Sequence, residues 1–155
     1  MEINKQQKIW LAALRITTGW LFFYAGLTKI LNPEWTAGGY LKGAKTFTGL
    51  YQWLASDGIL PIVDFLNEWG LLLIGVGLIL GIGVRWAGIL GAIMMVLYYF
   101  PVLEPGFKIA HGLVVDEHLI YASGLLVLSY FRAGSAFGLE SWFARTFPSI
   151  HRWIG

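Results

Sequence analysis

The chain has 155 residues, of which 57% are hydrophobic and only 13% are charged, about half the charged share of soluble domains. With a mean hydropathy of +0.64, a soluble domain of this size could not bury so much apolar surface. The net charge of +2 is too small to indicate a nucleic-acid partner, and the absence of cysteine excludes disulfides, thiol catalysis and thiolate metal sites. Composition therefore indicates a small polytopic membrane protein in a lipid bilayer.

Four apolar segments approach the roughly 20 residues that a bilayer crossing requires, and each predicts a membrane-spanning helix. They run over about residues 9–31, 60–84, 86–103 and 114–131. Pro61 suits the start of the second helix, and only Arg85 separates the second segment from the third, which predicts a tight helical hairpin. The predicted fold class is all-α, an integral membrane four-helix bundle that forms one domain over residues 1–155.

Two further segments carry aromatic side chains but are too polar to span. The first loop, residues 32–59, and the C-terminal tail, residues 137–153, each have apolar residues at helical spacing. Both predict amphipathic helices at the membrane interface. The balance of lysine and arginine between the loops places both termini in the cytoplasm, in the inner (plasma) membrane.

The first segment contains two cations, and charge inside a membrane helix is costly and functional by default. Fourteen residues at about 100° per residue bring Lys29 back to within about 40° of Arg15. Gly19, Phe22 and Gly26 lie between them on the same face. That face is too polar and too small for lipid, so it should contact other helices or a cavity.

Antiparallel packing gathers other polar residues at the same end of the bundle as Lys29. Asp64 and Glu68 are four residues apart and share one helix face. Residues 116–118, Asp-Glu-His, open the fourth segment, and His111 lies in the preceding loop. No HxxxH or ExxH pattern accompanies them, so the sequence predicts no metal site. Aromatic residues of the same end could line an entrance for a flat ring such as a quinone, although an aromatic belt is the simpler interpretation.

The charged residues and the paired glycines of these segments also have purely structural interpretations. Lys29 and Glu68 could form a buried pair that only fixes helix register, and Arg15 could extend toward the interface or bind backbone carbonyls. The other acids of this end could be solvated helix-end residues. Gly77 and Gly81 form a small-xxx-small pair, which is typical of tight helix packing.

Three motifs occur in order along the chain. The first segment contains LRITTGWLFFYAGLTKILNP, the second contains EWGLLLIGVGLILGIGVRWAG, and the fourth is followed by RAGSAFGLESW. In these motifs the chain resembles the DoxX/DoxD family of small four-helix membrane proteins, over nearly its whole length. The last motif departs from the family's glycine-arginine-x-x-x-leucine-aspartate pattern, because Arg132 precedes the glycine and Glu140 replaces the aspartate. The long polar loop after the first segment is closest to the DoxD branch.

The resemblance implies a membrane-bound oxidoreductase, because DoxD-like proteins are associated with thiosulfate:quinone oxidoreductase. That enzyme joins two thiosulfates into tetrathionate and reduces quinone, which would be a substrate or bound cofactor here. No flavin or metal site is evident in the sequence. Whether the chain is catalytic by itself stays open, because electrons could pass directly between substrates or through a second oxidoreductase subunit.

The chemistry assigns roles to the polar residues. A thiosulfate dianion needs fixed cations, and quinone reduction needs two protons. The predicted catalytic residues are therefore Glu68, Lys29, Arg15 and His118. The predicted substrate-binding residues are Asp64, Asp116, Glu117, Trp35, Tyr40 and Trp69.

Two other classes of function remain open. The amphipathic loop and aromatic tail suit a non-catalytic membrane scaffold that anchors a redox partner complex. A small-solute or proton carrier is weakened by the lack of a visible inverted repeat. Homo-oligomerisation is expected in either case, because a bundle of this size leaves glycine faces to cover.

Overall fold

The computed structural model describes residues 4–109 and 112–147, and these form an almost wholly helical molecule. The elements in chain order are α1 (Lys5–Ile30), α2 (Gly38–Lys42), α3 (Thr48–Leu54), α4 (Leu60–Leu80), α5 (Val84–Val102), β1 (Lys108–Ile109), β2 (Gly112–Leu113), α6 (Glu117–Tyr130), the 3₁₀ helix η1 (Ala133–Ser135) and α7 (Glu140–Thr146). The all-α prediction is confirmed.

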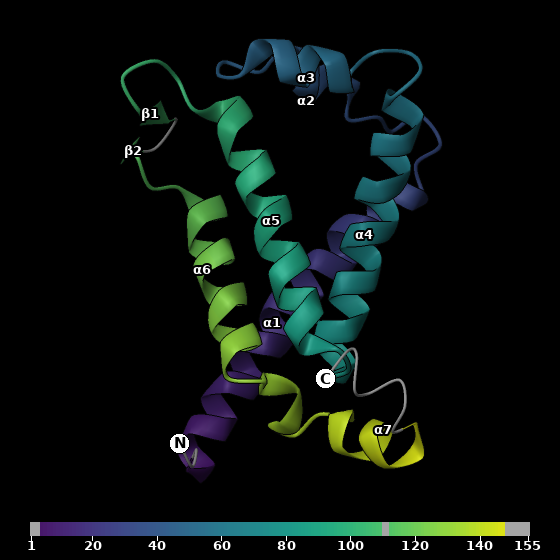
Figure 1. Ribbon diagram of the computed structural model, residues 1–155, viewed down its shortest axis with the longest axis vertical. Coiled ribbons are helices and arrows are strands. Elements are labelled where there is room, and N and C mark those ends of the chain that lie inside the picture. Colours follow the sequence, from purple (N-terminus) through teal and green to yellow (C-terminus); the bar gives the residue numbers. More distant parts are fainter. Residues whose placement is uncertain (1–3, 110–111, 148–155) are drawn as a thin grey trace.

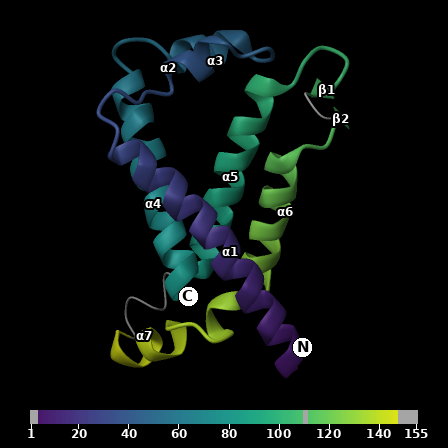
Figure 2. The ribbon, with the colours of Figure 1, turned by 180° about the vertical axis from the view of Figure 1, so that it is seen from behind.

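Four helices run between two short helical layers (Figures 1 and 2). Helix α1 packs along α4, α5 packs along α6, and α4 and α5 join the two pairs. We call α2 and α3, which lie across one end, the roof, and η1 and α7, which lie across the other end, the floor. The N-terminus of α1 lies at the floor end, so α1 and α5 run toward the roof while α4 and α6 return.

By length and hydropathy α1, α4 and α5 can each cross a membrane. The fourth helix of the bundle, α6, has only 14 residues, so the predicted range 114–131 was too long. Asp116 ends the preceding loop because its side chain accepts hydrogen bonds from the backbone N–H groups of His118 and Leu119, as an N-cap does. Before it, Val114 has a left-handed φ of 64°, which no helix allows.

The polar face predicted for α1 is the face that it buries. The buried residues of α1 are Ala12, Arg15, Gly19, Phe22 and Gly26. A Cβ atom added at Gly26 would lie 2.5 Å from the backbone nitrogen of Leu72 on α4, so the two backbones touch there.

The turn between α4 and α5 is made by glycines rather than by Arg85, which lies in the first turn of α5. Gly81 and Gly83 have φ angles of 70° and 62°, the left-handed conformation that ends one helix and precedes the next. Gly81 is the C-cap of α4, so it ends the helix in which the Gly77–Gly81 pair was predicted, although a Cβ atom at Gly81 would still lie 2.8 Å from the Cα atom of Gly138.

The roof is fastened to the C-terminal end of α5. Pro101 has no N–H, so the carbonyl of Leu97 loses its helical partner, and the hydroxyl of Tyr51 in α3 donates to that carbonyl at 2.8 Å instead. The Thr46 hydroxyl donates to the Phe100 carbonyl at 2.6 Å. The predicted amphipathic helix is α3, which buries Tyr51.

The tail contains shorter helices than the predicted segment 137–153. Helix α7 ends at Thr146, and residues 148–153 of that prediction lie outside the described residues, as does His111. Phe137 and Trp142 are exposed, as expected for side chains at a membrane interface.

Candidate functional site

At the roof end, Asp116 and His118 form a hydrogen-bonded dyad. The carboxylate Oδ2 of Asp116 lies 2.7 Å from Nδ1 of His118, and both side chains are largely buried. Because the carboxylate can only accept, Nδ1 carries the proton and Nε2 is the nitrogen that can exchange one with a ligand. The same carboxylate caps α6, so the helix start holds the dyad in place.

The dyad continues into a polar group between α5 and α4. The ring of Tyr98 meets the ring of His118 edge-on, with 6.0 Å between centroids. The Tyr98 hydroxyl faces the side chain of Asn67 on α4. Within the described chain, neither this hydroxyl nor the Asn67 Oδ1 makes a hydrogen bond of good geometry, although both atoms are buried. Buried polar atoms without partners are rare in proteins, so these two mark a place for a water or a ligand oxygen.

Tyr40 covers this group from the roof. Its hydroxyl donates to the backbone carbonyl of Tyr98, and the two tyrosine rings meet edge-on at 6.1 Å. Burial raises the pKa of Tyr40 above its usual value, and the neighbouring tyrosines and the carboxylates of Asp116 and Glu117 raise it further. Tyr40 therefore stays a neutral hydrogen-bond donor.

Lys29 and Glu68 form a second polar group on the α1–α4 pair. Their charges attract each other, but their side chains do not form a direct ion pair in the described structure. The Lys29 ammonium instead lies 5.1 Å from the centre of the Trp35 ring, in a cation–π contact. The ammonium also donates to the Ala25 carbonyl at 3.4 Å, and its remaining donors have no partner among the described residues.

Three predicted binding residues have other surroundings. Both carboxylate oxygens of Asp64 accept hydrogen bonds at 2.8 Å, from the Thr36 hydroxyl and the Ala37 N–H, so Asp64 anchors the loop before α2. Glu117 is exposed at the start of α6. Trp69 is also exposed and packs against Phe65 on the surface of α4.

Arg15 lies at the floor end, away from the other predicted catalytic residues. Its side chain is 1% exposed and is attracted by the charge of Glu140 on α7. Gly81 and Gly138 make room for it, because a Cβ atom at either glycine would collide with Arg15 Nη1. The structure thus separates Arg15 from Lys29, although both lie on one face of α1.

Sequence reasoning missed three residues of these sites. Asn67 is a polar residue inside an apolar segment and directly precedes Glu68. That pattern was a sufficient signal to predict that Asn67 belongs to the polar site. Tyr98 looked like a member of an aromatic belt. Glu140 stood at the aspartate position of the last motif, and that position was the signal for its pairing with Arg15.

The described residues contain no group of three or more His, Cys, Asp or Glu side chains placed to hold a metal ion. Besides the carboxylates of Asp116 and Glu68, the polar groups at the roof end are hydroxyl, amide, imidazole and ammonium groups. Such groups suit the oxygen atoms of an organic ligand better than a cation.

Comparison with known proteins identifies the family of this chain. The DoxX family model matches residues 10–103, which is more than half of the chain and includes most of α1 and all of α2 to α5. No curated protein and no solved structure gives a significant match. The matched range contains Arg15, Lys29, Glu68 and Tyr98, whereas the Asp116–His118 dyad and Glu140 lie beyond it.

Proposed function

This chain belongs to the DoxX family, and we propose that it is the membrane subunit of a quinone-linked oxidoreductase. The observation that carries the proposal is the pair of buried, unpartnered polar atoms on Tyr98 and Asn67 beside the Asp116–His118 dyad. A quinone carbonyl oxygen is an acceptor of the kind that the Tyr98 hydroxyl lacks. The aromatic rings of Tyr40 and Tyr98 supply an apolar wall for a flat ring.

The residues around this place can deliver protons. A quinone takes up two electrons and two protons when it becomes a quinol. His118 can pass a proton from Nε2 while Asp116 stabilises the imidazolium form through Nδ1. Glu68 follows Asn67 in α4 and is the second proton donor in this proposal. The proposal therefore assigns one proton donor to each helix pair, His118 on α6 and Glu68 on α4.

Thiosulfate is the proposed electron donor. Two thiosulfate dianions give tetrathionate and two electrons, which balances the reduction of one quinone. Lys29 is the cation at the roof end that would attract the dianion, and protonated His118 would add a second charge. Arg15 is enclosed by the floor, so its role in the proposal is electrostatic support rather than contact with substrate. In this proposal the electrons pass either directly between the bound substrates or through a second oxidoreductase subunit, and activity of the purified chain by itself distinguishes the two routes.

The proposed location is the inner membrane with the floor in the cytoplasm. Lys5, Lys8, Arg85, Arg132 and Arg145 belong to the floor end, whereas the roof end carries Lys42, Lys45 and Lys108. The positive-inside tendency favours the end with more lysine and arginine. Thiosulfate would then reach the roof from outside the cell.

The test is thiosulfate-dependent reduction of a short-chain quinone by the purified chain in lipid. We expect Glu68→Gln and Lys29→Met to abolish turnover while the protein still inserts and stays monodisperse. Tyr98→Phe should weaken quinone binding, read as quenching of tryptophan fluorescence, without removing the aromatic wall. Glu34→Gln is the matched control, because Glu34 is an exposed acid of the same end.

Normal turnover in Glu68→Gln and Lys29→Met would contradict the proposal. If the folded chain neither turns over nor binds quinone, the second candidate, a membrane scaffold for a redox complex, gains support. It is favoured by the exposed aromatic residues Phe47, Trp53 and Trp142 on the roof and floor. Its own test is recovery of a stoichiometric partner subunit with the tagged chain from native membranes.

A further inference from the structure

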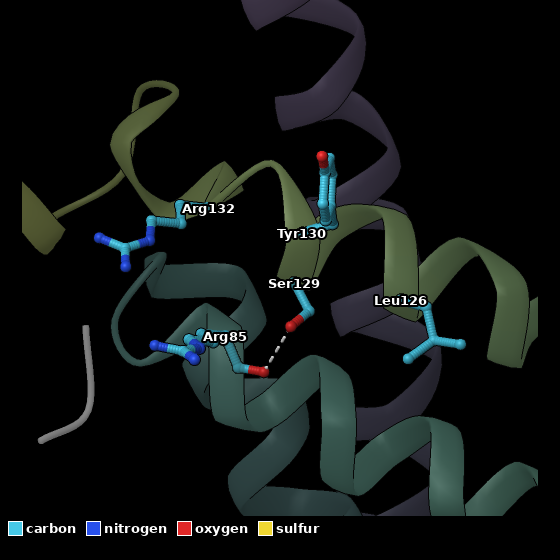
Figure 3. Close-up of a pocket in the computed structure, with 5 residues that line it drawn as sticks. All are labelled: Arg85, Leu126, Ser129, Tyr130 and Arg132. Carbon is cyan, nitrogen blue, oxygen red and sulfur yellow. Dashed lines mark hydrogen bonds between the residues drawn. The ribbon is translucent and has the colours of Figure 1, made fainter. Parts of the chain in front are cut away.

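A pocket of about 490 Å³ opens between α5 and α6 at the floor end, far along the bundle from the polar groups of the roof (Figure 3). It is lined by Arg85, Leu126, Ser129, Tyr130 and Arg132. The guanidinium groups of Arg85 and Arg132 extend to the same side of the helix pair. No acidic side chain lines the pocket, and neither arginine forms an ion pair within the described residues.

Direct contacts between α5 and α6 form the frame of this pocket. The Ser129 hydroxyl donates to the backbone carbonyl of Arg85 at 2.9 Å and ties α6 to the first turn of α5. Gly88 allows the close approach, because a Cβ atom there would lie 2.6 Å from the carbonyl oxygen of Leu125. Two like charges are therefore held on neighbouring elements by the backbone, without a counter-charge among residues 4–109 and 112–147.

Arg132 adopts a backbone conformation that is unfavourable for a residue with a side chain. Its φ is 46°, in the left-handed region, and its N–H donates to the Ser129 carbonyl at 3.2 Å. Glycine follows two residues later at Gly134, yet the strained position carries the arginine. Residues held in such conformations concentrate at binding sites.

The lining changes from polar to apolar along α6. Tyr130 is 83% exposed at the end of the helix, and Leu126 lies one turn earlier, about 6 Å nearer the middle of the bundle, and is also exposed. A free inorganic anion would gain no favourable contact from this apolar edge. A phospholipid fits this arrangement, because its phosphate would lie beside the two arginines while its acyl chains continue along Leu126 toward the middle of the bundle.

We propose that this pocket binds a phosphate oxyanion, and that its source is the headgroup of an anionic phospholipid. Arginine suits this role because its planar guanidinium donates two parallel hydrogen bonds to phosphate oxygens. Basic pockets between membrane helices are known to take up acidic lipid headgroups. The inference stands on the floor end alone and is independent of the proposed redox function.

The test measures binding of phosphatidylglycerol and phosphatidylcholine to the detergent-purified chain by native mass spectrometry. The double variant Arg85→Gln, Arg132→Gln should bind phosphatidylglycerol roughly twenty-five-fold more weakly, at roughly fivefold for each arginine removed. The matched control is Lys8→Gln, Arg145→Gln, which removes two exposed charges from the same end and should change binding less than about twofold.

Equal losses in the two double variants, or equal binding of both lipids by the unaltered chain, would overturn the proposal. If the first double variant does not fold, two other measurements decide the question. They are the binding of the two lipids to the unaltered chain and the binding of phosphatidylglycerol to the single variants Arg85→Gln and Arg132→Gln. Inorganic phosphate is the further probe. Competition by millimolar phosphate against phosphatidylglycerol would overturn the lipid source in favour of free phosphate, whereas no competition supports the lipid.

Discussion

Arg15 shows how a single charge can be kept inside an apolar bundle. Its guanidinium is almost fully enclosed, with the glycines of the α4 C-cap and of the floor around it and the carboxylate of Glu140 nearby. A buried charge is tolerated only with a counter-charge, and removing that counter-charge leaves the full cost of desolvation. Arg15 therefore joins α1 to α7, two elements at opposite ends of the sequence.

A double-mutant cycle measures this connection. Arg15→Met and Glu140→Gln should each destabilise the protein by about 3–5 kcal/mol. The first leaves the buried carboxylate of Glu140 without its counter-charge, and the second leaves the buried guanidinium of Arg15 without its counter-charge. The double variant should be less destabilised than the sum by about 1–3 kcal/mol. The measurement is unfolding by SDS titration in mixed micelles, with Arg145→Met and Glu34→Gln as exposed controls. Additive effects would show that Arg15 and Glu140 do not interact.

The sequence predicted which face of α1 is buried, because residues at helical spacing identify a face without knowledge of its partner. It did not predict that Arg15 and Lys29 lie at different ends of the molecule, with different neighbours. Their separation along the axis is about 21 Å at 1.5 Å per residue, so a shared face cannot bring them together. The partner of Arg15 depended on the fold of the tail, which periodicity does not encode.

At the level of elements, the C-terminal end of α5 depends on the roof for its hydrogen bonds. The Leu97 carbonyl has no helical donor because Pro101 occupies the position that would supply it. An unsatisfied carbonyl at membrane depth is costly, since lipid offers no donor. Pro101 thus leaves a carbonyl of α5 free, and Tyr51 of α3 donates to it, so that together they fix the roof on α5.

Replacement of Tyr51 by Phe tests this coupling. Tyr51→Phe should destabilise the protein by about 1–3 kcal/mol, because it orphans a buried carbonyl. Adding Pro101→Ala restores a backbone N–H four residues after Leu97, so the double variant should lose less stability than Tyr51→Phe does. Thermal unfolding followed by circular dichroism measures both. Tyr24→Phe, at an exposed tyrosine of α1, should be neutral, and an equal loss there would contradict the interpretation.

Helix ends were the least predictable feature of the elements. Apolar sequence continues from residue 80 to residue 84, past the end of α4, and the left-handed φ angles of Gly81 and Gly83 divide α4 from α5 before Arg85 is reached. The start of α6 was likewise invisible to hydropathy, because the apolar residues 113–115 precede the N-cap without being helical. Capping chemistry at Asp116 decided that boundary.

At the scale of the whole molecule, two helix pairs are tied together by the roof and the floor. The roof is held to α5 by hydroxyl groups of Tyr40 and Tyr51, which donate to backbone carbonyls. Burial raises the pKa of both tyrosines above the ordinary value. The number of bundle helices and the existence of both surface layers followed from the sequence, whereas the division into pairs depended on close glycine contacts.

These tyrosines predict how stability depends on pH. When the pKa is raised in the folded state, the stabilisation is complete below the unfolded value of about 10 and is lost as the pH rises above it. The free energy of unfolding should therefore show no tyrosine contribution to pH dependence up to about pH 9 and should fall steeply above pH 10. Tyr40→Phe, Tyr51→Phe should be less stable at neutral pH but lose less above pH 10. Parallel curves for the two proteins would contradict this prediction.

The shortness of α6 has a consequence for the surrounding lipid. Its 14 residues extend about 21 Å, whereas a typical hydrocarbon core is about 30 Å thick. This hydrophobic mismatch of about 9 Å must be met by a local dimple in the bilayer or by water standing above the start of the helix. The Asp116–His118 dyad lies at that start, which is the end of the helix where such water would stand. A thicker membrane would deepen the dimple, which makes bilayer thickness a physical variable to which this protein responds.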